Sequence, residues 1–151
     1  MITIEEFKKK QTSKTRLIGL DLGSKRIGVS ICDERQSIAT PFKTIDRINT
    51  THLVDKLKEI IKENNIKGIV IGNPINMDGS SGSSARSVKD ISINISKSID
   101  LPVFLWDERL STVGAFNLYS QLDVNISKKL KKIDQNAAAF ILQGAIDYLN
   151  N

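Results

Sequence analysis

Two residue types that often carry chemistry are scarce in this sequence of 151 residues, which has one cysteine and one histidine. A single thiol excludes an internal disulfide and a zinc site built from several thiolates. Cys32 falls in a segment rich in Val and Ile, and we interpret it as a small core residue. His52 stands where a helix is expected to begin, and we assign it a structural or surface role. Acid–base chemistry must therefore use other groups.

Long apolar runs are also absent. No stretch approaches the roughly 20 residues that a membrane-spanning helix needs, and residues 1–15 carry lysines and glutamates without the apolar segment of a secretory signal. We expect residues 1–16 to form a partly disordered N-terminal extension and residues 17–150 to form one domain. We also expect a cytoplasmic protein with no membrane association. The net charge of +5 and the pI near 9.4 favour polyanionic partners, but only weakly.

The hydrophobic pattern predicts an α/β fold. Apolar and alternating runs predict a hairpin over residues 17–22 and 26–32, an edge strand over 37–45, and further strands over 68–72 and 102–108. Helical periodicity appears over residues 49–64, 85–98, 112–121 and 134–149, with a basic linker at 127–132 before the last helix. Three meandering strands followed by strand–helix alternation predict a mixed sheet with helices on both faces.

Carboxylates occupy unusual places in this pattern. Asp21 interrupts an otherwise apolar strand, where a charge is costly unless it is paired or binds a metal. Asp107 and Glu108 end a later strand, and Asp134 opens the last predicted helix. If these segments are neighbours, the acids converge into a site for Mg²⁺ or Mn²⁺, hard cations that prefer oxygen ligands. The alternatives are that Asp134 only caps its helix and that Glu108 pairs with Arg109 on the surface.

Basic residues accompany the acids along the chain. Lys25 and Arg26 follow Asp21 across a tight turn, where a scissile phosphate would lie. Arg86, after a loop rich in Gly, Ser and Asn, and Arg109, beside the acidic pair, are candidate phosphate contacts. Lys128 and Lys129 belong to the densest basic run, for which a solvated face is the alternative. Because aromatic residues make up only 5% of the chain, recognition of shape and backbone is expected rather than base stacking.

At the same residues the sequence resembles a known family. The matching segments are GLDLGSKRIGV at 19–29, GNPINMDGSSG at 72–82, DERLST at 107–112 and DQNAAAFILQ at 134–143. They resemble the YqgF/RuvX-type pre-16S rRNA nucleases, also described as Holliday junction resolvases, of the ribonuclease H-like superfamily. The sequence departs from that family's usual pattern at Asn73 and Ser111, which are not among the acids.

The resemblance implies a ribonuclease H-like mixed sheet of five strands flanked by helices on both faces. It also implies three acidic catalytic positions, which match Asp21, Glu108 and Asp134, as ligands of Mg²⁺ or Mn²⁺. Because side chains alternate along a strand, only one of Asp107 and Glu108 can face the metal, and we favour Glu108.

The expected function is that of a metal-dependent nuclease that hydrolyses phosphodiester bonds and processes the 5′ end of pre-16S ribosomal RNA. One alternative is a Holliday junction resolvase acting on four-way DNA, which would normally be a dimer. Another is a non-catalytic RNA-binding ribosome assembly factor on an inherited fold. The chain is too short for the two lobes of sugar kinases and actin. Either a monomer or a homodimer fits the sequence.

Overall fold

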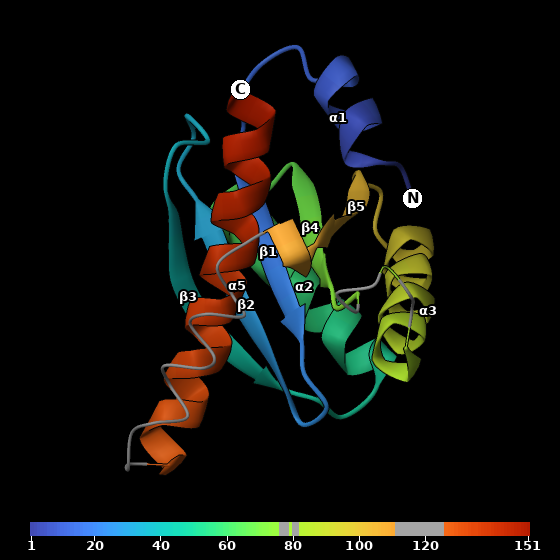
Figure 1. Cartoon of the computed structure of the whole chain (residues 1–151), viewed down its shortest axis with the longest axis vertical. Helices are drawn as coiled ribbons and strands as arrows, with labels where there is room; N and C mark the ends of the chain where they lie inside the picture. Colours follow the sequence, from blue (N-terminus) through green and yellow to red (C-terminus); the bar gives the residue numbers. More distant parts are fainter. Residues whose placement is uncertain (76–78, 80–81, 111–125) are drawn as a thin grey trace.

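A five-stranded mixed sheet forms the centre of the molecule in the computed structural model (Figure 1). The structure describes residues 1–75, 79, 82–110 and 126–151, and of residues 126–135 it describes the backbone alone. The strands are β1 (Leu17–Leu22), β2 (Arg26–Cys32), β3 (Ala39–Asp46), β4 (Gly68–Asn73) and β5 (Val103–Asp107). The helices are α1 (Ile4–Lys10), α2 (Thr50–Asn64), α3 (Ser83–Ser98), the short 3₁₀ helix η1 (Glu108–Leu110) and α5 (Ile126–Asn150).

The strand order is β3-β2-β1-β4-β5. The first three strands form the expected antiparallel meander, and β1, β4 and β5 run parallel to one another. Leu20 of β1 pairs with Ile71 of β4, and Ile71 pairs with Leu105 of β5. Because parallel strands end at the same edge, the segments that follow these three strands lie at one end of the sheet.

Helices cover both faces of the sheet, as predicted. α5 crosses the face of β1, β2 and β3 that is nearer the viewer in Figure 1, and α1 lies beside its C-terminal end. α2 and α3 cover the other face, where the aliphatic side chains of alternate strand positions form the larger core. No helix within the described residues is both long enough and apolar enough to span a membrane.

The segment expected to be partly disordered contains a helix instead. Thr3 and Glu6 form a reciprocal capping box at the start of α1, a local signal that is visible in the sequence as T-I-E-E. Phe7 is buried, and its ring centroid lies 4.8 Å from that of Phe104 in β5. This packing against the sheet stabilises a helix that would be too short to persist alone.

The last helix begins earlier than the sequence analysis predicted. α5 starts at Ile126, so the basic stretch 127–132 is helical rather than a linker, and Asp134 lies within the helix instead of capping it. Lysine and leucine are good helix formers, and the apolar residues Leu130, Ile133 and Ala137 continue the helical spacing of the C-terminal part. The predicted helix at 112–121 lies outside the described residues.

A very close approach joins α5 to the sheet. Gly19 of β1 lies under the helix, and a Cβ at this position would stand 2.6 Å from Ser30 Oγ and 2.7 Å from Leu142 Cβ. The hydroxyl of Ser30 donates a hydrogen bond of 2.7 Å to the carbonyl oxygen of Ala138. Gly19 and Ser30 thus fix the height of α5 above β1 and β2, because one has no side chain and the other has a short hydroxyl.

Candidate active site

Asp21 is the first element of the site and lies on the face of the sheet that carries α5. Gly19, two residues earlier, packs directly under that helix, and side chains at i and i+2 of a strand point to the same face. Asp21 pairs in register with Gly28 of β2 and is half-buried. The strand therefore holds this carboxylate near its C-terminal end, beside a neighbour without a side chain.

Glu108 reaches the same face from two strands away. It is the first residue after β5, and its carboxyl carbon lies 3.4 Å from the point where a Cβ of Gly72 would stand. The Cδ1 atom of Ile141, from α5, lies 2.5 Å from that point. Gly72 thus leaves space on β4 between Asp21 and β5, and Glu108 and Ile141 occupy this space.

The electrostatics show that the two acids interact. The pKa of Glu108 is raised to about 7, mainly by burial and, to a smaller extent, by the negative charges of Asp21 and then Asp107. Two carboxylates held together in a partly desolvated place favour a shared cation or a proton. This pair is consequently a place where positive charge is stabilised.

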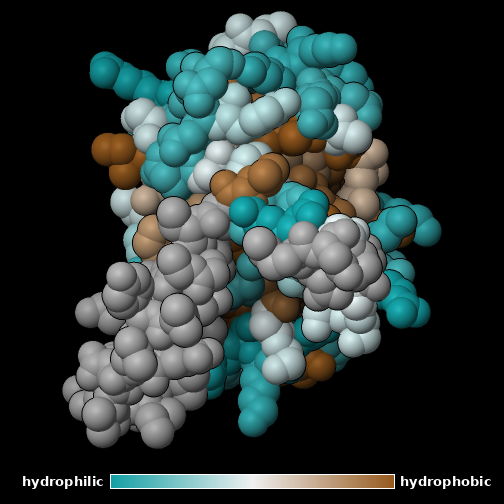
Figure 2. Space-filling model, in the orientation of Figure 1, coloured by the Kyte–Doolittle hydropathy of each residue, from teal (hydrophilic) through white to brown (hydrophobic). Residues whose placement is uncertain are grey.

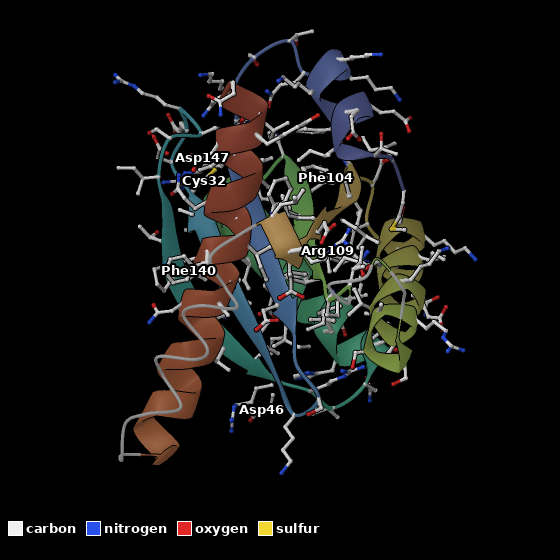
Figure 3. The ribbon with its side chains drawn as sticks, viewed as in Figure 1. Cys32, Asp46, Phe104, Arg109, Phe140 and Asp147 are labelled. Atoms are coloured by element: carbon white, nitrogen blue, oxygen red, sulfur yellow. The ribbon has the colours of Figure 1, made fainter. Side chains whose placement is uncertain are left out.

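Asp107 has a different role from Glu108. Its carboxylate accepts hydrogen bonds from the Arg109 backbone N–H at 3.0 Å and from the guanidinium Nη2 at 2.7 Å. The hydrogen bond from the Arg109 side chain is the main cause that lowers the pKa of Asp107. Figure 3 shows Arg109 extending from η1 toward the side of α3. Glu108 lies against Gly72 and Ile141 of α5, whereas Asp107 is bonded to Arg109. Which of the two acids binds a metal stays a prediction.

Asp134 lies in α5, but its side chain is outside the described residues. Its position is four residues, about one helical turn, before Ala138, the residue bonded to Ser30. Among the described side chains, no three Asp, Glu, His or Cys groups come together as a metal site. The predicted third acid thus stays a prediction.

The predicted basic contacts fall into separate groups. Lys25 is exposed and Arg26 is half-buried, and both lie at the turn between β1 and β2, close in sequence to Asp21. Arg109 is ion-paired with Asp107 at 2.7 Å. Arg86 is exposed in the first turn of α3, on the other side of the sheet from Asp21. Lys128 and Lys129 lie in the first turn of α5, and their side chains are outside the described residues.

Sequence reasoning missed the residues that shape the site without carrying charge. Gly72 and Ile141 determine where Glu108 lies, and Ser30 anchors the helix that carries Asp134. The only sequence signal for them was a glycine in a buried strand, which indicates a close approach. Figure 2 shows hydrophilic residues over the outer parts of the described surface of this face and hydrophobic residues nearer its centre.

Comparison with known proteins gives concordant results. A family model described as "RuvX: Holliday junction resolvase" matches residues 15–148. A protein of Pelagibacter ubique named "Putative pre-16S rRNA nuclease" is 78% identical over 151 residues, which cover 100% of both chains. A protein of the same name from Cereibacter sphaeroides is 43% identical over 148 residues, covering 98% of this chain and 92% of that one.

Two solved structures share the fold at low sequence identity. RuvC of T. thermophilus, in complex with a Holliday junction substrate, superposes with a TM-score of 0.53 at 9% identity, covering 89% of this chain and 95% of that chain. The yeast mitochondrial Holliday junction resolvase Ydc2 gives 0.51 at 12% identity, covering 97% and 84%. The predicted ribonuclease H-like fold is thereby confirmed.

Proposed function

The chain belongs to the RuvX family, and on that premise we propose that it is a metal-dependent nuclease that hydrolyses phosphodiester bonds at the 5′ end of pre-16S ribosomal RNA. The observation that carries the proposal is the Asp21–Glu108 pair. These two acids come from β1 and from the end of β5, and they lie close enough for the charge of Asp21 to raise the pKa of Glu108. The substrate is proposed from the names of the relatives.

The residues present fit a divalent cation. Both groups of the pair are carboxylates, the hard oxygen ligands that Mg²⁺ and Mn²⁺ prefer, and their repulsion is relieved by positive charge between them. We propose that Asp21, Glu108 and Asp134 hold Mg²⁺ or Mn²⁺. When bound, such ions polarise the phosphate, lower the pKa of water and stabilise the leaving oxygen.

The chain's own residues would prepare the site for this chemistry. Gly72 and Ile141 confine the Glu108 carboxyl on the side of β4, near enough to Asp21 for the two charges to interact. Arg109 forms an ion pair with Asp107, which offsets a third negative charge on the other side of the strand. Lys25 and Arg26 would bind phosphates of the strand to be cut, since arginine and lysine supply donors and charge for phosphate oxygens.

The test compares two substrates with one inactive variant. Precursor-like ribosomal RNA and a four-way DNA junction are incubated with the full chain and Mg²⁺ or Mn²⁺, alongside Asp21→Asn. The matched control is Asp55→Asn, which changes an exposed aspartate of α2 in the same way. We expect RNA cleavage that Asp21→Asn abolishes and Asp55→Asn preserves. Full cleavage by Asp21→Asn would contradict the proposed role of the pair.

A second candidate is resolution of four-way DNA junctions, because the matching family model is described as a Holliday junction resolvase. Two symmetric cuts require two active sites, normally in a dimer. Junction cleavage without RNA cleavage, by a chain that sediments as a dimer, would favour this candidate. Binding of RNA with no cleavage of either substrate would instead indicate a non-catalytic assembly factor.

A further inference from the structure

A groove lies on the opposite face of the sheet from the acidic pair, where the N-terminal ends of α2 and α3 meet. Its volume is about 640 Å³, and its apolar lining consists of Ile27, Ile48, Leu53 and Ile91. Its polar lining includes two arginines and several hydroxyl and amide groups, namely Arg47, Asn49, Thr50, Ser83, Arg86 and Ser87. Asp46, the last residue of β3, lies at the lower end of the sheet in Figure 3. The next residue, Arg47, lines the groove.

Arg47 connects the groove to the strand that carries Asp21. Its guanidinium Nη1 donates to the carbonyl oxygen of Gly23 at 2.8 Å, and its backbone N–H donates to the carbonyl oxygen of Lys25 at 3.0 Å. Its Nη2 also lies 3.5 Å from Ser87 Oγ on α3. The arginine therefore spans from the β1–β2 turn, two residues after Asp21, to the first turns of α3. A group bound in the groove would be held in a fixed position relative to the acidic pair.

The charges of the groove favour an anion. One acid, Asp90, also lines it, one helical turn after Arg86 on α3. Within the described part of the chain, Arg86 and Asp90 do not form an ion pair with each other. Two guanidinium groups thus face one carboxylate. The positive ends of two helix dipoles add to this excess, and hydroxyl groups supply further donors.

We propose that this groove binds a backbone phosphate of the nucleic acid at a distance from the bond that is cut. The substrate would pass from the acidic pair over Lys25 and Arg26 at the β1–β2 turn and reach Arg47 and Arg86 on the other face. This inference rests on the proposed function. It implies a nucleic acid substrate that is long or branched enough to contact both faces of the sheet. The recognised chemistry is a phosphodiester, which arginine binds through paired N–H groups.

The test measures binding rather than cleavage, so that it can fail independently of the proposed function. In the Asp21→Asn background, fluorescence anisotropy follows binding of a long and a short form of each labelled substrate while salt is raised from about 50 to about 200 mM. Arg86→Ala is compared with Arg35→Ala, which removes the same charge from an exposed arginine in the β2–β3 turn. Arg86→Lys tests whether charge alone suffices.

We expect Arg86→Ala to weaken binding of the long substrate roughly threefold to tenfold and to reduce the slope of log affinity against log salt by about 0.9, the value for one phosphate contact. The loss should be smaller for the short substrate, and Arg35→Ala should leave the slope unchanged. Equal slopes for Arg86→Ala and Arg35→Ala would overturn the proposal.

A second measurement separates nucleic acid from a free anion as the occupant. Inorganic phosphate is titrated into the full chain by calorimetry, with Arg86→Ala as the comparison. Weak binding of phosphate alone, with the salt slope of nucleic acid binding still dependent on Arg86, supports a backbone contact. Tight phosphate binding that requires Arg86, with no effect of Arg86→Ala on nucleic acid, would show a small-anion site and overturn the inference.

Discussion

Ser30 Oγ donates a 2.7 Å hydrogen bond to the carbonyl oxygen of Ala138, at a point where both residues are completely buried. The same hydroxyl lies 3.4 Å from the carbonyl oxygen of Gly19. One short side chain of β2 therefore links β1 to the helix that carries Asp134. The position of that helix over β1 depends on this buried polar contact.

Replacing Ser30 with alanine should reduce both stability and activity. The variant leaves the Ala138 carbonyl without its side-chain donor, and we expect the free energy of unfolding to fall by about 1–3 kcal/mol. Urea denaturation followed by circular dichroism measures this loss. Ser13→Ala, at an exposed serine, is the control. An unchanged midpoint for Ser30→Ala would show that this bond does not anchor α5.

Glu108 should cost stability at neutral pH when no metal is present. Its folded pKa of about 7 lies above its ordinary 4.5, so the folded chain binds more protons than the unfolded chain between these values. Stability then falls as pH rises through this range. We expect Glu108→Gln, in EDTA, to gain on the order of 2–3 kcal/mol at about pH 8 and almost nothing at about pH 4.

Thermal unfolding at both pH values measures this effect of Glu108. Glu63→Gln, which changes an exposed glutamate of α2, should alter the melting temperature little at either pH. A stabilisation by Glu108→Gln that is equal at both pH values would mean that its cause is not the ionised carboxylate. A destabilisation at about pH 8 would reverse the predicted sign.

Gly72→Ala should disturb the site through Ile141. The new Cβ would stand 2.5 Å from Ile141 Cδ1, which must move, and 3.4 Å from the carboxyl carbon of Glu108. We expect a loss of about 1–2 kcal/mol in stability and of roughly tenfold to a hundredfold in cleavage rate, because small displacements of catalytic groups are costly. Ile141→Val removes the contacting methyl group, so the double variant should regain part of both losses. Additive losses would contradict this mechanism.

Asp107 and Glu108 should differ in their effect on catalysis. Asp107→Asn weakens the ion pair with Arg109 and alters the η1 turn, so we expect roughly a tenfold reduction in activity, as for residues that only orient a ligand. Glu108→Gln removes a proposed ligand and should abolish metal-dependent cleavage. Titration of Mn²⁺ at fixed substrate separates the two, because only Glu108→Gln should lose saturable metal dependence. The reverse ranking would assign the ligand to Asp107.

Much of this molecule is determined by local sequence. The apolar run of β1, the alternation of β2, the helical spacing of α2 and the capping signals of α1 are each readable within one short segment. Strand alternation also predicted that only one of Asp107 and Glu108 faces the proposed site, and in the structure the Glu108 carboxyl lies against Gly72. An acid in an apolar strand identified Asp21 as a candidate because burying an unpaired charge is costly.

Two features were harder to predict because both depend on more than periodicity. They are the residue at which α5 starts and the folding of residues 4–10 into the helix α1. A lysine-rich segment resembles a linker until its apolar positions are aligned with those that follow, and a helix as short as α1 persists through contacts such as Phe7 with Phe104. The metal ligands and the role of Asp134 stay predictions.

The sequence by itself determined where the five strands and the helices α2 and α3 lie, where the acids stand along the chain, and to which family the chain belongs. Tertiary structure decided which of these segments meet. Gly72 with Ile141, Ser30 with Ala138, and Arg47 with Gly23 each join residues that are distant in the chain. Such contacts depend on strand order and on the height of a helix above the sheet, and no local pattern of a single sequence encodes these quantities.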